Sequence, residues 1–501
     1  MKKVRQVVAL TIALSYVAVC HSVAAQEPRL VANAKNPETN TASVNKTTPL
    51  SEEVEALKQR VTELESQNRE MIQILKAVNA RLEKADEKTT PPKTLQAANK
   101  SLAAPETAQP QTQTVKPEVA KAAPPVELVK WNEVTAGGSK IKLYGFLRLD
   151  MVGDSQRPNN PQSPQFITSP DGANNKAGAG NFSLFSKFTR LGIDFSGPRI
   201  AKLGDAKISG RYEMDFFGTV GAESRSNARI RFAWIKLNWE HASVVIGQDW
   251  QIVAPLLPMP NQHSDMFYIG NVGDRHALIK TEWKQKIGAG NLFLQGGVGT
   301  TGASDSEDLD NDGFRDGETS KLPNIEGRVA YAQSLWVKDK PMTIGFGGLY
   351  GSEKTIKPIV GRTDFNPKLI AFDYVLPLTK KIDLRGENWR GTHLTDFRGG
   401  INQAVNLTTG REIRARGGWS ELKLTANSFY AFHAGLTSDD PVDGDLPTNA
   451  RTRNRSGYFG TRVTPSPNFT FGFDFLRWKT DYKGLSSGTD NRVNLIFQYN
   501  F

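Results

Sequence analysis

The chain has 501 residues, 38% of them hydrophobic, and a net charge of +11 at neutral pH, so it is long enough for a large folded unit and clearly basic. Its one cysteine, Cys20, lies in the N-terminal export signal described below, which excludes disulfides and cysteine metal sites from the mature chain. Export also argues against nucleic acid as a partner, and attraction for small anions is the more natural consequence of the basic charge.

Residues 1–25 are predicted to be a secretory signal peptide. Three basic residues precede an apolar run that ends at Cys20, and Val23-Ala24-Ala25 resembles a small-residue cleavage site. Removing this segment takes away three positive charges and leaves a formal charge of +8, which is 11 − 3. No later segment is apolar over the roughly 20 residues that a membrane helix needs. An exported chain of this kind can therefore span a membrane only as a barrel.

Residues 26–130 contain no Phe, Tyr or Trp and so cannot build a conventional globular core. Within them, residues 51–85 carry apolar side chains in steps of three and four, which predicts an α-helical coiled coil for trimerisation. Two flanking isoleucines widen its apolar face and favour three strands over two. The seam consists of Val54, Leu57, Val61, Leu64, Asn68, Met71, Leu75, Val78 and Leu82. Residues 26–50 are expected to be disordered, and residues 86–138 to form a Pro/Ala/Thr-rich linker.

Strand-like runs separated by turn residues recur through residues 139–501, and they predict an all-β fold, a 16-stranded antiparallel transmembrane β-barrel. The runs lie near 140–152, 182–196, 205–218, 227–239, 242–249, 276–286, 289–300, 323–337, 341–352, 368–377, 381–393, 412–424, 426–436, 453–464, 468–482 and 492–501. Long connections alternate with short turns, as expected for outer and inner rims. An even number of strands places both barrel ends, and with them the coiled coil, on the periplasmic side of a bacterial outer membrane.

The last strand shows the two-sided pattern most clearly. Val493, Leu495, Phe497, Tyr499 and Phe501 share one face, and polar residues occupy the other. An apolar outer face and a polar inner face are typical of a barrel with lipid outside and water inside. We therefore expect outer-membrane lipid and lipopolysaccharide as surroundings, and the barrel assembly machinery as a partner of this C-terminal strand.

Basic residues on the strands are predicted to point inward, because a guanidinium at the bilayer midplane costs roughly 2–4 kcal/mol. The predicted pore-lining residues are Arg148, Arg190, Lys207, Arg211, Arg229, Arg231, Arg328 and Arg385. Each could equally pair with a neighbouring acid and only brace the wall, and both interpretations stay open. The strands that carry Arg414, Arg416, Arg453, Arg455 and Arg477 alternate too irregularly for their faces to be assigned.

The segment 249–275 is too long for a tight turn and unusually apolar for a surface loop. We predict that it folds into the lumen and narrows the pore, with Asp249, Asp265 or Asp274 facing the basic wall.

An acidic stretch at 308–316 resembles the start of a calcium loop, with carboxylates at Asp308, Asp310, Asp312 and Asp316. The Glu expected at its twelfth place is replaced by Thr319, so a bare acidic loop without Ca²⁺ remains the alternative. No other cofactor is predicted. The histidines beyond the predicted signal peptide form no catalytic motif with neighbouring residues, and we do not expect an enzyme; they are His241, His263, His276, His393 and His433.

From the coiled coil to Phe501 the chain resembles the DcaP-type trimeric outer-membrane porins. The resemblance is carried by KLYGFLRLD (142–150), TRLGIDFSGP (189–198), GRYEMDFFG (210–218), RIRFAWIKLNW (229–239), VVIGQDW (244–250), LRGENW (384–389), DDP with ARTRNRS (439–456) and FGFDFLRWKTDY (471–482). These are scaffold motifs rather than ligand motifs. The resemblance implies a sixteen-stranded homotrimer, a periplasmic coiled coil, and uptake of small anions such as dicarboxylates.

The sequence therefore predicts a passive porin for small, preferentially anionic solutes. Two alternatives join a coiled coil to a barrel in other ways: a trimeric-autotransporter-like adhesin, and a barrel that tethers the cell envelope. About 360 barrel residues per chain argue against the adhesin, in which each chain contributes only a few strands of roughly 10 residues.

Overall fold

The computed structural model describes residues 132–136, 138–171, 179–218, 226–260, 265–304 and 307–501. The predicted signal peptide, disordered segment and coiled coil, and nearly all of the predicted linker, lie outside these residues. None of the described helices is long and apolar enough to cross a membrane.

Eighteen strands form one antiparallel sheet. They are β1 (Glu133–Ala136), β2 (Ser139–Asp154), β3 (Asn181–Phe185), β4 (Arg190–Ile200), β5 (Ala206–Asp215), β6 (Arg229–Asn238), β7 (Ala242–Trp250), β8 (Arg275–Ile287), β9 (Gly290–Thr300), β10 (Pro323–Gln333), β11 (Met342–Tyr350), β14 (Lys368–Pro377), β15 (Ile382–Thr392), β18 (Arg414–Thr425), β19 (Tyr430–Pro441), β20 (Arg451–Ser466), β21 (Phe469–Tyr482) and β22 (Gly488–Asn500).

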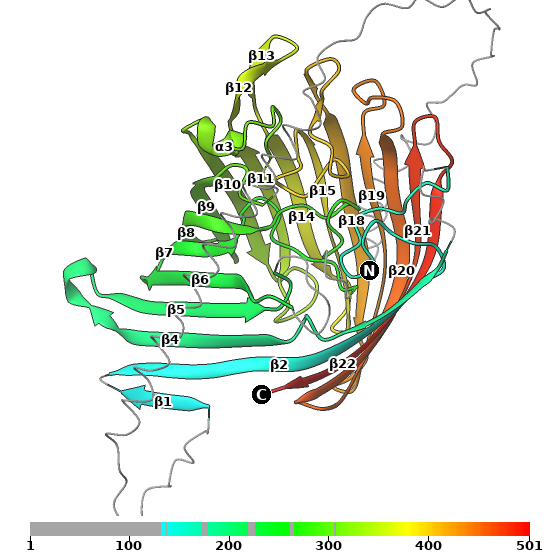
Figure 1. The fold of residues 1–501 in the computed structure, drawn as a ribbon. Coiled ribbons are helices and arrows are strands. Elements are labelled where there is room, and N and C mark those ends of the chain that lie inside the picture. Colours follow the sequence, from blue (N-terminus) through cyan, green and yellow to red (C-terminus); the bar gives the residue numbers. More distant parts are fainter. Residues whose placement is uncertain (1–131, 137, 172–178, 219–225, 261–264, 305–306) are drawn as a thin grey trace, which may run out of the picture. The chain divides into compact units, whose positions relative to one another are not determined.

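The sheet closes into a barrel of sixteen strands, as predicted. β3 and β4 both pair with one edge of β2, one after the other, and together count as one barrel strand. The other edge of β2 pairs with β22 along most of its length and with the short β1 at its beginning, so β1 adds no separate barrel strand. Neighbours in the chain are neighbours in the barrel, until β22 returns to β2 and closes it (Figure 1). Because one chain supplies the whole barrel, the arrangement differs from the few strands per chain that the adhesin alternative requires.

Apolar side chains cover the outside of the barrel and polar ones the inside. Leu147, Phe346 and Ile370 are between 57% and 66% exposed, whereas Asp215 and Asp474 on inward faces are completely buried. Such a continuous exposed apolar surface would be unfavourable in water but suits lipid. The alternation predicted from the sequence is therefore confirmed.

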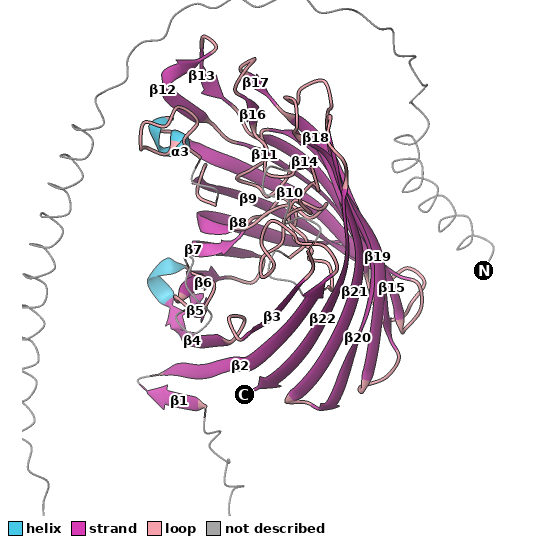
Figure 2. Ribbon diagram, turned by 45° about the vertical axis from the view of Figure 1, so that its right-hand side comes forward, coloured by secondary structure: helices cyan, strands magenta, loops and turns pink. Residues whose placement is uncertain are grey.

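The segment between β7 and β8 lies inside the barrel, as predicted, and is here called the inner loop (residues 251–274; 261–264 are outside the description). Three wall glutamates accept hydrogen bonds from its backbone: Ile252 N–H donates to Glu326 (2.7 Å), Leu256 N–H to Glu387 (2.6 Å) and Met259 N–H to Glu421 (2.8 Å). Those glutamates belong to β10, β15 and β18. The inner loop is thus fastened along one wall, inside the strand layer (Figure 2).

Apolar packing seals the inner loop against the same wall. Val253, Ala254 and Val272 pack with Leu369 and Trp389 in one buried cluster. A second cluster joins Met266 and Ile269 of the loop to residues of β20 and β21: Tyr458, Leu476 and Trp478. The loop also approaches β18 so closely that a Cβ on Gly270 would lie 2.4 Å from the Gly418 carbonyl oxygen, which only glycine avoids.

Several elements depart from the predicted pattern. The predicted strand 182–196 is interrupted between β3 and β4, where Phe188 packs against Phe185. The predicted strand 426–436 begins later, as β19, because the Asn427 side chain accepts backbone N–H groups of Phe429 and Tyr430 and forms a turn. The long connections also carry small elements beyond one end of the barrel (Figure 2): β12 (Glu353–Ile359), β13 (Arg362–Phe365), β16 (Val405–Asn406), β17 (Arg411–Glu412) and α3 (Asp316–Thr319); η1 (Ala201–Leu203) lies in the turn after β4.

Candidate functional site

Arginines gather on the inner faces of β4, β6 and β8, where they interact with Asp265 of the inner loop. Arg229 and Arg231 are two residues apart on β6, so both point to the same side of the strand. Arg231 binds Glu213 and Asp215, each at 2.8 Å, and Arg229 binds Asp215 at 2.7 Å. Charge-assisted pairs of this kind hold the guanidinium groups in defined positions.

Arg190 is the least engaged member of this group. It stands at the start of β4, 3.6 Å from a Glu213 carboxylate oxygen, and its buried Nε has no hydrogen-bond partner among the described residues. The side chains of Arg190 and Arg229 keep 23% and 31% of their surface exposed. Arg190 and Arg229 can therefore touch a solute directly, whereas the buried Arg231 contributes mainly its electric field.

A fourth member, Arg275, was not predicted. It begins β8, and its guanidinium lies over the Trp250 ring, 4.6 Å from the centroid. Arg275 and Ile279 are four residues apart on β8, so strand alternation places them on the same face. Because Ile279 faces outward, the pattern alone would place Arg275 on the lipid side. Only the fold shows that it interacts with Arg231 and Asp265 inside the barrel.

Asp265 of the inner loop, one of the three candidates named from the sequence, interacts electrostatically with this arginine group, and its role in a constriction stays a prediction. Removal from water raises the pKa of its carboxyl above the usual value, while Arg275, Arg231 and Arg190 act in the opposite direction. We call Arg190, Arg229, Arg231 and Arg275 with Glu213, Asp215 and Asp265 the arginine cluster. Asp274 also lies 3.7 Å from Arg275, but its charge is matched by Arg398 at 2.6 Å. With that pair left out, the cluster holds four cations and three carboxylates, so one positive charge is in excess among these described residues.

The other two aspartates that were candidates for the constriction have different surroundings. Asp274 binds Arg398 at 2.6 Å; although burial raises the pKa of Asp274, Arg398 and Arg275 outweigh it and hold that pKa below the usual range. Asp249 belongs to β7 rather than to the loop, and it pairs with Lys280 at 2.7 Å.

Most of the remaining basic candidates form close pairs with wall acids. Arg211 binds Asp194 through two hydrogen bonds (2.7 and 3.0 Å), and Arg328 binds Asp373 likewise (2.8 and 2.7 Å). Further pairs join Arg148 to Asp150 (2.9 Å) and Arg385 to Glu421 (2.9 Å), and Lys207 is exposed near the start of β5. These pairs brace the wall, and a pore-lining role for these residues stays a prediction.

The acidic loop brings together three of its four predicted calcium ligands. Oxygen atoms of Asp308, Asp310 and Asp316 lie within 4.8 Å of one another, whereas Asp312 is outside that group and accepts the Phe314 N–H. Burial raises the pKa of Asp316 to about 7, and nearby carboxylates add to the effect. All three clustered acids also accept backbone N–H groups, at 2.6–3.1 Å. Calcium binding here stays a prediction.

No protein-family model matches the chain, and no curated protein matches it either. Among solved structures, the outer membrane channel DcaP of Acinetobacter baumannii is 19% identical, with 73% of this chain and 99% of that chain covered and a TM-score of 0.57. An anion-selective porin from Comamonas acidovorans is 15% identical over 72% of this chain and 100% of that one, with a TM-score of 0.47. OmpF of Salmonella typhi is 12% identical, with 74% of this chain and 100% of that chain covered and a TM-score of 0.45.

The first of these comparisons bears on the predicted resemblance. Its TM-score and near-complete coverage of the DcaP channel describe the same barrel architecture, reached at low sequence identity. The barrel of this chain therefore has the DcaP-like fold that its scaffold motifs predicted.

Proposed function

We propose that the chain is an outer-membrane porin, which forms a water-filled channel for passive uptake of small solutes and prefers anions such as dicarboxylates. The barrel supports the general part of this proposal, because a closed wall with an apolar outside and a polar inside satisfies every backbone group within a bilayer. The inner loop supports the idea of a selective pore, since it lies inside the barrel and takes up part of the lumen.

The arginine cluster is the observation that carries the anion preference. Four arginines meet three carboxylates there, so a solute passing between the inner loop and the wall experiences a positive field. The planar guanidinium of Arg190 can bind both oxygens of a carboxylate, whereas Arg229, which already holds both oxygens of Asp215, has only its remaining N–H groups to offer. A solute with two carboxylates could exchange between these two partly exposed groups.

The mechanism needs no chemical step. Fixed positive charge lowers the barrier for an entering anion and raises it for a cation, and diffusion then carries the solute across. Pairs elsewhere on the wall, such as Arg211 with Asp194 and Arg328 with Asp373, balance their own charges and brace the wall. Binding at the cluster must stay weak, because a tightly held solute would block the channel.

We further propose that three chains assemble through the coiled coil at residues 51–85 and that the barrel resides in a bacterial outer membrane. The heptad seam supports trimerisation, and the aromatic C-terminal strand suits recognition by the barrel assembly machinery.

Planar-bilayer recording of the purified protein in a salt gradient tests the proposal. We expect discrete channel openings and a reversal potential of the sign that anion preference produces. Swelling of protein-loaded liposomes should be faster with small dicarboxylates than with amines of similar size, with neutral alcohols in between. Cation preference would remove the proposed role of the arginine cluster, and the lack of any openings would reject the porin itself.

A further inference from the structure

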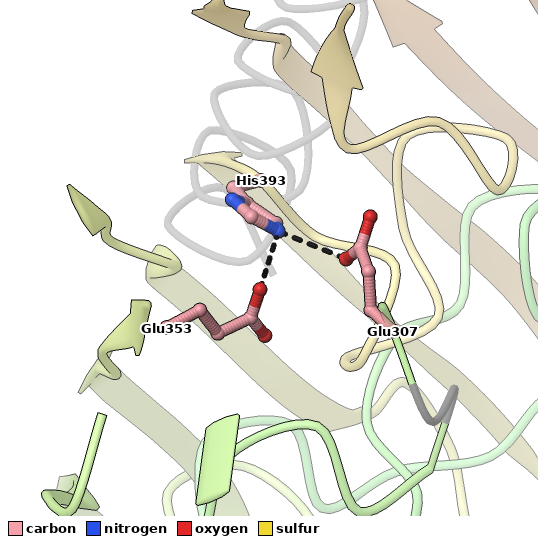
Figure 3. Close-up of side chains that lie close together, drawn as sticks. All are labelled: Glu307, Glu353 and His393. Atoms are coloured by element: carbon pink, nitrogen blue, oxygen red, sulfur yellow. Dashed lines mark hydrogen bonds and ion pairs between the residues drawn. The ribbon is translucent and has the colours of Figure 1, made fainter. Parts of the chain in front are cut away.

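Glu307, Glu353 and His393 meet beyond the end of the barrel that carries the long connections (Figure 3). They come from three successive connections: Glu307 lies between β9 and β10, Glu353 begins β12 between β11 and β14, and His393 directly follows β15. One oxygen of Glu307 and one of Glu353 each lie 2.9 Å from Nε2 of His393. Side chains that are 40 or more residues apart in the chain therefore converge on one atom.

The burial of this trio makes its charge significant. The side chains of His393 and Glu353 are completely buried, and that of Glu307 is 15% exposed. A single Nε2 hydrogen cannot form a good hydrogen bond to two carboxylates at once, and two buried carboxylates repel each other. A divalent cation at this position would remove the conflict.

The surroundings also resemble those of a metal-binding histidine. The second ring nitrogen, Nδ1, faces a Glu412 carboxylate oxygen at 3.9 Å, and the Phe365 ring packs edge-on against the imidazole. Thr395 donates a hydrogen bond from its hydroxyl to the Glu307 oxygen that faces His393, at 2.9 Å. Metal-binding histidines commonly turn their other nitrogen toward a carboxylate, and metal-binding carboxylates are themselves hydrogen-bonded, because these contacts orient the ligands.

We propose that Glu307, Glu353 and His393 bind a divalent transition-metal ion of the zinc class. One imidazole nitrogen and two carboxylate oxygens supply three ligands of a tetrahedral site and leave the fourth position for water. The nitrogen ligand favours Zn²⁺ over Ca²⁺, which takes oxygen ligands. This site is distinct from the all-oxygen group of Asp308, Asp310 and Asp316 that the sequence singled out.

The proposed ion would join the three connections that contribute Glu307, Glu353 and His393. Its role is structural, at the rim, and separate from the arginine cluster in the lumen. The proposal therefore does not depend on the anion preference of the pore.

Zinc content of the purified full-length protein is the decisive measurement. The protein is stripped with a chelator, equilibrated with Zn²⁺ alone, dialysed and analysed for metal, with thermal unfolding recorded in parallel. We expect about one ion per chain and a higher unfolding temperature with zinc, in keeping with tight binding to the folded state alone. Wild-type protein that retains no zinc overturns the proposal, whatever the variants do.

Variants locate the ion. His393→Gln and Glu307→Gln should each abolish zinc retention, because each removes one of the three proposed ligands. His241→Gln is the matched control, because His241 is exposed beside Glu240 at 3.7 Å, and this variant should keep the ion. Zinc that survives in His393→Gln but disappears in Asp308→Asn would place the ion in the acidic loop and reject the proposed ligands.

Discussion

The two walls of the lumen use their charged residues for different purposes. On β10, β15 and β18, the acids Glu326, Glu387 and Glu421 accept backbone hydrogen bonds from the inner loop and hold it in place. On β4, β6 and β8, Arg190 and its neighbours interact instead with Asp265 of that loop. Acids and bases are both abundant in the lumen, but the acids on the first wall are occupied in anchoring. Charge counts over the whole lumen therefore say little about selectivity, and the local balance at the arginine cluster matters more.

Removing the three glutamates that hold the inner loop should have the largest effect on conductance. In the triple variant Glu326→Ala, Glu387→Ala and Glu421→Ala, three loop N–H groups lose their acceptors, at about 1–3 kcal/mol for each group. We expect the inner loop to detach, so that single-channel conductance rises severalfold and anion preference falls. Glu282→Ala is the control, because Glu282 accepts a hydrogen bond from Gln295 on the neighbouring strand. Unchanged conductance in a correctly folded triple variant would show that the loop does not narrow the pore.

The Arg190→Gln substitution should have the next largest effect. Among the described residues Arg190 makes one long ion pair and one contact with the Phe146 ring, so its loss should cost little stability. The substitution nevertheless cancels the positive excess of the arginine cluster. We expect a clear loss of anion preference in the reversal potential and slower liposome swelling with dicarboxylates. Arg414→Gln removes the same charge from an exposed arginine, which pairs with the buried Asp445 outside the cluster, and should leave both readouts unchanged. Equal losses in the two variants would mean that overall charge, not the cluster, sets selectivity.

The pH dependence of selectivity sharpens the role of Asp265. Burial raises the pKa of this carboxyl, so it becomes neutral at a higher pH than an ordinary aspartate as the solution is acidified. Its protonation removes a negative charge facing Arg190, Arg231 and Arg275, so anion preference should increase as pH falls. Reversal potentials recorded over a pH series check this. In Asp265→Asn the acid-side increase should be absent, and a wild-type profile in that variant would assign the titration to another group.

Deleting residues 26–130 should have the smallest effect on conduction. Both walls and the inner loop lie in the barrel, so single-channel current should persist while the trimer dissociates at a lower temperature. Electrophoresis of unheated and heated samples measures the second effect, and bilayer recording measures the first. Correctly assembled barrels without conductance would show that the N-terminal region contributes to the pore.

Strand number, strand faces and the inward path of the loop could be predicted because each depends on local pattern. Alternation separates Tyr212 from Arg211 and Glu213 without knowledge of any partner, and residues 251–274 are too apolar for a surface loop. Alternation fails for Arg275, because this first residue of β8 points into the barrel although its position in the alternation places it on the outer face. The small strands β12 and β13 were missed for a related reason: their residues have no barrel face and no regular alternation.

The sequence by itself determined a two-sided, sixteen-stranded wall, since period-two patterning acts within each strand and needs no distant contact. Only the tertiary structure decided which acid meets which arginine, and that three separate connections bring Glu307, Glu353 and His393 together. Pairing between strands and loops depends on barrel closure and register, which position residues far apart in the chain. Whether a charged side chain braces the wall, anchors the loop or remains open to a solute therefore follows from its neighbours in space.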